Sequence, residues 1–90
     1  MTHEAAADVA VLRGLDTLPG IAVDAETIDV YARPFWPPNT CPCSEPVRLE
    51  AITKALARLH RTGDCNRIDT RHQGTLYQLT PKGQMAARSA

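Results

Sequence analysis

The hydrophobic period of this chain changes at Gly63, and that change restricts the folds it can adopt. Before the glycine, four apolar side chains recur at steps of three, four and three residues, namely Leu49, Ile52, Leu56 and Leu59. Such a stripe is typical of an amphipathic helix, which Gly63 ends. After it, residues 65–70 and 75–79 are rich in β-prone side chains around a turn at 72–74. The pattern predicts a long helix followed at once by a β-hairpin.

Two further helices and one extended rung are predicted upstream. Alanines and apolar residues at three-residue steps favour a helix over about residues 2–18, which a Pro-Gly pair at 19–20 ends. Residues 21–23 form a short β-prone run. Asp24 is typical of a helix N-cap, and Pro34 closes that second helix because the residue before a proline disfavours helical geometry.

A proline-rich stretch then separates the second helix from the long one. Four prolines in residues 34–43 remove backbone donors and predict a loop, whose Phe35 and Trp36 we expect to pack inward. Ser44 is predicted to cap the long helix, and Thr80 to cap a short last helix that begins at a proline. In the hairpin, Thr75 and Tyr77 are the candidates for outward-facing positions.

Length and charge set the class of protein. Ninety residues predict one domain, 1–90, with a thin, mostly aliphatic core. No apolar run approaches the roughly 18–20 residues of a membrane span, and we expect a cytoplasmic protein. The net charge is zero, but residues 1–43 hold two basic against six acidic side chains, and residues 44–90 hold eight against four. The second half can therefore present a basic face.

Two segments carry a family resemblance. One is Leu59-His60-Arg61-Thr62-Gly63 at the end of the long helix, and the other is Tyr77-Gln78-Leu79-Thr80-Pro81-Lys82-Gly83 after the hairpin. With the order of the elements, they resemble winged-helix transcription regulators of the MarR and PadR kind. The resemblance implies an α+β, mostly helical fold: a winged helix-turn-helix with three helices, a β-hairpin wing and a short C-terminal helix.

The resemblance also implies a function, which is binding of double-stranded DNA as a small bacterial or phage regulator of transcription. The helix at about 46–62 would enter the major groove, and the wing at about 66–79 would reach the adjacent backbone or minor groove. Arg48 is the strongest candidate for reading a guanine edge. The expected DNA-binding residues are Arg48, Thr53, Lys54, Arg58, Arg61, Arg67, Arg71, His72, Gln73, Thr75 and Lys82.

The long loop at about 33–43 departs from the three- or four-residue turn usual before a recognition helix. It leaves two other functions open. One is a winged-helix module that binds a protein partner, with the acidic N-terminal half as a partner or homodimer surface. The other is a thiol- or metal-responsive regulator acting through Cys41 and Cys43. No catalytic motif is present, so we expect no enzymatic activity, no cofactor and no bound metal.

Overall fold

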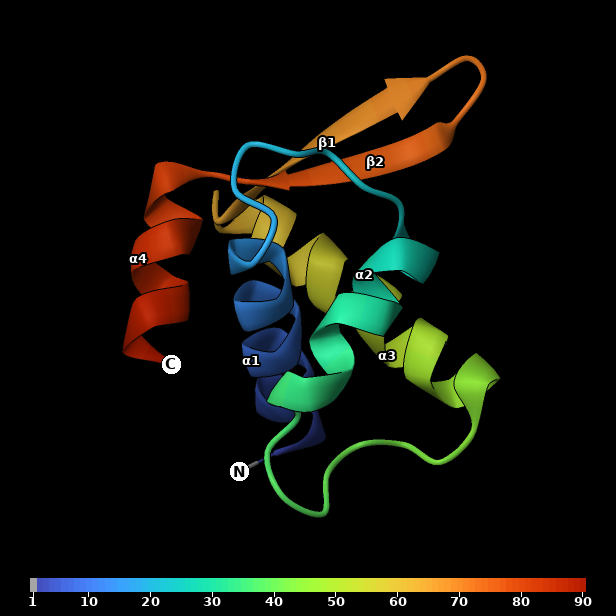
Figure 1. Cartoon of the computed structure of the whole chain (residues 1–90), viewed down its shortest axis with the longest axis vertical. Helices are drawn as coiled ribbons and strands as arrows, with labels where there is room; N and C mark the ends of the chain where they lie inside the picture. Colours follow the sequence, from blue (N-terminus) through green and yellow to red (C-terminus); the bar gives the residue numbers. More distant parts are fainter. Residues whose placement is uncertain (1) are drawn as a thin grey trace.

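Four α-helices and one β-hairpin build the fold of the computed structural model, which describes residues 2–90 (Figure 1). The elements are α1 (His3–Asp16), α2 (Ala25–Ala32), the 3-10 turn η1 (Arg33–Phe35), α3 (Glu45–Arg61), β1 (Cys65–Thr70), β2 (Gly74–Leu79) and α4 (Pro81–Ser89). The expected α+β, mostly helical class is confirmed, and the layout is compatible with a winged helix. Within residues 2–90, no helix is both long and apolar enough to cross a membrane.

The helix starts follow local capping chemistry. The Asp24 carboxylate accepts a hydrogen bond from the Thr27 N–H at 2.8 Å, and the Thr80 hydroxyl accepts one from the Gly83 N–H at 3.0 Å. Both caps were predicted from the sequence. The expected Ser44 cap is wrong in its chemistry: Ser44 occupies the cap position of α3, but its side chain makes no capping hydrogen bond.

The hairpin is anchored to the body by the segment between α1 and α2. The Val23 backbone exchanges two hydrogen bonds with Tyr77, at 2.9 and 2.8 Å, so the extended rung predicted at 21–23 is confirmed at its last residue, Val23. Tyr77 packs against the core together with Cys65 and Leu79, so its expected outward orientation is wrong. The reason is the register, in which alternate residues share a face and those three occupy the inner one.

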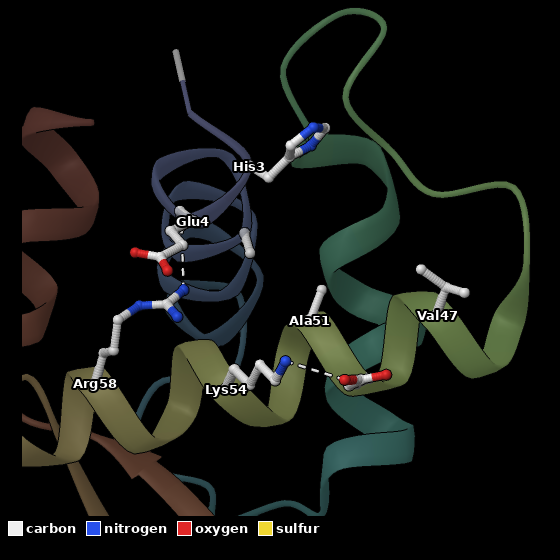
Figure 2. A pocket seen from close by; sticks show the side chains of 8 residues that line it. His3, Glu4, Val47, Ala51, Lys54 and Arg58 are labelled. Carbon is white, nitrogen blue, oxygen red and sulfur yellow. Dashed lines mark hydrogen bonds and ion pairs between the residues drawn. The ribbon is translucent and has the colours of Figure 1, made fainter.

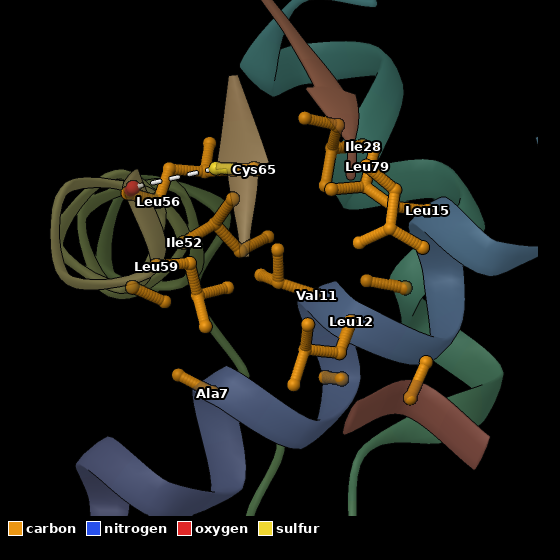
Figure 3. Packing of buried hydrophobic residues seen from close by; sticks show 14 of the residues in the cluster. Ala7, Val11, Leu12, Leu15, Ile28, Ile52, Leu56, Leu59, Cys65 and Leu79 are labelled. Carbon is orange, nitrogen blue, oxygen red and sulfur yellow. Dashed lines mark hydrogen bonds between the residues drawn. The ribbon is translucent and has the colours of Figure 1, made fainter. Parts of the chain in front are cut away.

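The core surrounds α1. Val11 and Leu15 of α1 are fully buried, and they lie between α3, which contributes Ile52 and Leu56, and the end of β2 (Figure 3). The helices approach one another closely because many of the contacts are alanine. At Gly14 the approach requires glycine, since a Cβ there would lie 2.9 Å from the Cα of Ala32 in α2 and 3.0 Å from its nitrogen.

The loop over residues 36–44 is held at both ends. Trp36 is buried as expected, while Phe35 is half-buried with the Arg13 guanidinium 4.8 Å above its ring centre. The turn in the middle is closed by Thr40, which donates to the Pro37 carbonyl, and it places Asn39 in the left-handed region at φ 63°. The loop thereby carries both exposed cysteines to the start of α3.

Candidate nucleic-acid interface

The buried face of α3 differs from the predicted stripe by one residue. Arg48 is buried, with 9% of its surface exposed, whereas Leu49 is only half-buried. The solvent-facing side carries a mixture of charged, polar and small side chains: Val47, Glu50, Thr53, Lys54, Ala57 and Arg61. The expectation that Arg48 faces a DNA groove is therefore wrong.

Arg48 is turned inward by Asp29 of α2. The guanidinium donates Nε to Oδ1 at 2.6 Å and Nη2 to Oδ2 at 3.1 Å, which is a two-pronged ion pair. A weaker bond from Nη1 reaches the Pro42 carbonyl at 3.5 Å. Burial alone would raise the pKa of Asp29, but the hydrogen bonds from Arg48 and Arg33 outweigh it and hold that pKa below its ordinary value.

Two other expected DNA contacts of α3 have internal partners as well. Arg58 donates to the Asp8 carboxylate of α1 at 2.8 and 3.2 Å and to the Glu4 carbonyl at 3.2 Å. Lys54 forms an ion pair with Glu50 at 3.0 Å, one helical turn away, and both side chains are largely exposed. Figure 2 shows Arg58 directed at α1, while Lys54 lies along its own helix. An exposed pair of the Lys54 kind exchanges partners at little cost.

An open groove of about 280 Å³ lies between the start of α1 and α3 (Figure 2). Its floor is Ala7 and Ala51, and its rim carries Glu4, Lys54 and Arg58 among the charged side chains. Both cations on this rim already have carboxylate partners. The groove therefore presents no concentrated positive charge to an anionic ligand.

The hairpin turn exposes three polar side chains in a row. Arg71, His72 and Gln73 are exposed, and within residues 2–90 their side chains form no hydrogen bond or ion pair. Arg67 is also exposed and lies 3.3 Å from the Asp69 carboxylate, which accepts a second bond from Thr75 at 2.9 Å. Of the expected wing residues, the three at the turn are thus the ones fully directed to solvent.

Lys82 and Thr80 join the exit of the hairpin to its entry. The Lys82 ammonium donates to the Thr62 carbonyl at the C-terminus of α3, where the helix dipole favours a cation. The Thr80 hydroxyl lies 2.7 Å from the Gly63 carbonyl and 3.0 Å from that of Asp64. The Leu-Thr-Pro-Lys-Gly segment therefore acts as a clamp, and Lys82, which the sequence placed among the DNA contacts, bonds to the protein itself.

Part of the charge asymmetry of the sequence is an internal complementarity. Asp8 and Asp29 of the acidic half pair with Arg58 and Arg48 of the basic half. Neither carboxylate was predicted as a partner from the sequence. The signal for Asp29 was its place beside Ile28 on the apolar side of α2, where a charged residue needs a partner. Two of the cations counted toward a basic face are consequently bound within the fold.

The three cysteines fall into two environments. Cys41 and Cys43 are exposed in the loop, whereas Cys65 is buried under α3 with its thiol 3.8 Å from the Leu56 carbonyl. Burial, together with the nearby Asp64 charge, raises the pKa of Cys65 to about 11. Within residues 2–90, no three His, Cys, Asp or Glu side chains are grouped to hold a metal ion.

We expect an aromatic disulfide reagent at pH 8 to modify two thiols of the native protein rapidly. At that pH only about one Cys65 in a thousand would be a thiolate even if reagent reached it, because the thiolate is the reacting form. The third equivalent should appear only in denaturant. Rapid reaction of all three thiols in the native protein would contradict the burial of Cys65, and a Cys65→Ala variant identifies which equivalent is lost.

The comparisons with known proteins are negative throughout. No family model, no curated protein and no solved structure matches this chain.

Proposed function

We propose that this chain is a winged-helix domain that binds duplex DNA sequence-specifically, as a small cytoplasmic regulator of transcription. Helix α3 would lie in the major groove and the hairpin turn on the adjacent backbone or minor groove. The observation that carries the proposal is the turn: a cation, an imidazole and an amide follow one another at residues 71–73, all exposed, and none of the three side chains forms a hydrogen bond or ion pair within residues 2–90. Such groups are suited to phosphate and base-edge hydrogen bonds.

The set of DNA-contacting residues is revised from the one the sequence suggested. Arg48, Arg58 and Lys82 hold the fold together and are left out. The proposed contacts from α3 are Thr53, Lys54 and Arg61, all on its exposed side. Those from the hairpin are Arg67, Arg71, His72 and Gln73. The hydroxyl of Thr75 donates to the Asp69 carboxylate, so Thr75 is not among them. This smaller set predicts weaker dependence on salt than the full list would.

Fluorescence anisotropy of a labelled mixed-sequence duplex tests the proposal. At about 50 mM salt we expect a Kd of roughly 10⁻⁴–10⁻⁶ M for non-specific binding, weakening steeply toward about 200 mM as counterion release becomes less favourable. The double variant Arg61→Ala/Arg71→Ala should bind more weakly, and its salt slope should be smaller by about two. Both side chains are exposed, so the fold should be unaffected.

Arg88→Ala is the matched control. Arg88 is an exposed arginine of α4, away from α3 and the hairpin, and its loss changes the net charge in the same direction. It should leave the Kd within about twofold of the unmodified protein. Absence of binding at low salt, or equal weakening by Arg88→Ala and Arg71→Ala, would contradict a DNA interface on α3 and the hairpin.

A further inference from the structure

The outer edge of the hairpin is β1, on the side that faces away from β2 and Val23. β2 lies between β1 and Val23, whose backbone bonds to Tyr77 of β2. Within residues 2–90, no backbone group outside β2 bonds to residues 66–70. An exposed strand edge of this kind is a template for pairing with a further strand.

The register fixes which β1 groups face outward. Tyr77 directs its N–H and C=O to Val23, away from β1, so its partner Arg67 also directs both of its groups away from β2. The direction of the backbone N–H and C=O groups alternates from residue to residue along a strand, so those of Asp69 and Cys65 also point away from β2. Cys65 is already engaged, because its carbonyl lies 3.3 Å from Nδ1 of His60. The open edge therefore consists of the N–H and C=O groups of Arg67 and Asp69.

This edge is complementary to a second copy of itself. Two antiparallel copies exchange backbone hydrogen bonds only between residues whose groups face outward, and a two-fold axis makes every contact occur twice. If the two-fold axis passed beside Arg67, the Arg67 side chains of the two copies would lie opposite each other. An axis beside Asp69 would place the two Asp69 side chains opposite each other in the same way, so both arrangements bring like charges together. An axis beside Ile68 instead sets each Arg67 opposite Asp69 of the second copy, with two backbone hydrogen bonds in each of the two pairs. Opposite charges in that position are stabilising and like charges destabilising.

We infer that β1 is a self-association edge, at which two copies of this chain pair their β1 strands antiparallel about Ile68. A second copy is favoured over an unrelated strand because, in antiparallel pairing about Ile68, the charges of residues 66–70 are complementary to those of the same segment in the other copy. Charges of one sign on an edge would repel a second copy, whereas this edge carries one charge of each sign, Arg67 and Asp69.

The two faces of the paired strands support the same register. On one face, Arg67 and Asp69 of each copy alternate in sign. Hydrogen bonds from Thr75 and then Arg67 lower the pKa of Asp69, so the carboxylate is charged at neutral pH. On the other face, Ile68 is 39% exposed and pairs with half-buried Leu76. Pairing about Ile68 brings the two isoleucines together and covers an apolar surface that is open in one copy.

Charge reversal with complementation tests the inference, and it does not depend on DNA binding. Arg67→Asp makes both charges of the edge negative, and Asp69→Arg makes both positive. By sedimentation equilibrium we expect each variant alone to dimerise with a Kd at least about tenfold higher than that of the unmodified chain, because both cross-strand pairs become repulsive. An equimolar mixture of the two should recover dimers, since each Asp then faces an Arg.

The double variant Arg67→Asp/Asp69→Arg is the matched control. It keeps the composition and the complementarity while exchanging the positions, so its Kd should stay within about threefold of the unmodified chain. Circular dichroism of each variant confirms that the hairpin still folds. A monomer at concentrations up to about 1 mM would overturn the inference, as would single variants that dimerise as well as the unmodified chain or a mixture that recovers nothing.

Discussion

Replacing Arg48 with methionine is expected to lower the free energy of unfolding by about 3–5 kcal/mol, the usual cost of removing one partner of a buried ion pair. The variant leaves the Asp29 carboxylate in the interior with only Arg33, at 3.3 Å, as a cationic partner. It also removes the bond from Arg48 to the Pro42 carbonyl. Such a loss is a large share of the 5–15 kcal/mol that stabilises a typical domain. Urea denaturation followed by circular dichroism measures it.

Two companion variants show whether the buried pair is the cause. Arg33→Ala removes the exposed partner of Asp29 and should cost about 1 kcal/mol or less. Asp29→Leu/Arg48→Met replaces both charges by apolar groups and should recover much of the loss, since a buried pair contributes little beyond its own desolvation cost. A double variant as unstable as Arg48→Met would show that Arg48 acts through the loop rather than through Asp29.

The same pair gives the protein a defined response to acid. The folded-state pKa of Asp29 lies below its ordinary value, so the stability it contributes is present above about pH 4 and is lost as the pH falls through that lowered pKa. In Arg48→Met the remaining burial raises the pKa of Asp29, and protonation then favours the folded state. The stability difference between the two proteins should therefore narrow as the pH falls from 7 toward 4.

Gly83→Ala is expected to destabilise the fold by about 3 kcal/mol, the upper range for overpacking a close contact. Glycine to alanine inside a helix ordinarily adds about 1 kcal/mol of stability, so the expected sign is reversed. A Cβ at Gly83 would lie 2.0 Å from the Asp64 carbonyl oxygen and 2.7 Å from Cδ1 of Leu79. The Asp64 carbonyl is a backbone group and cannot turn aside as a flexible side chain can. Helix α4 therefore has to move away from the segment between α3 and β1. The midpoint of thermal unfolding reports the change.

Met85→Ala serves as the reference for that measurement. Met85 is on the same helix and 71% exposed, so its truncation should change the stability by no more than about 0.5 kcal/mol. If Gly83→Ala proved as stable as Met85→Ala, α4 would not lie against Asp64, and the clamp formed by Thr80 and Lys82 would be wrong as well.

Most features set by neighbours in sequence were predictable, although the side chain of Ser44 makes no capping bond, whereas the partners of the charged side chains were not. Asp24 and Thr80 cap their helices because an oxygen placed three residues before an N–H needs no tertiary contact. The positive φ of Gly63, 83°, ends α3 in the same local manner. Which face of the hairpin is buried depends on whether its odd-numbered or even-numbered residues meet the helices. The alternation of polar and apolar residues in the two strands did not decide between these two possibilities.

Arg48 shows why the candidate site was harder to predict than the fold. Both Arg48 and Leu49 lie within helical reach of Ile52, so either could complete the apolar stripe. Leu49 is apolar and was therefore expected to be the buried residue. Arg48 is buried instead because it pairs with Asp29, which lies on another helix 19 residues earlier. Lys82 was misassigned for the same reason, because its partner is a carbonyl 20 residues away. The residue type of a cation does not distinguish one that faces a ligand from one that pairs within the fold, as Arg48 and Lys82 do.

The central position of α1 has a consequence for biosynthesis. This helix packs against α2, η1, α3, β2 and α4, so its partners are spread over the remainder of the sequence. During synthesis from the N-terminus, α1 leaves the ribosome with its apolar face uncovered. Asp8 has no Arg58 to pair with until another fifty residues have been added. The buried cluster around α1 is complete only once α4 has been synthesised, because Ala87 of that helix belongs to it.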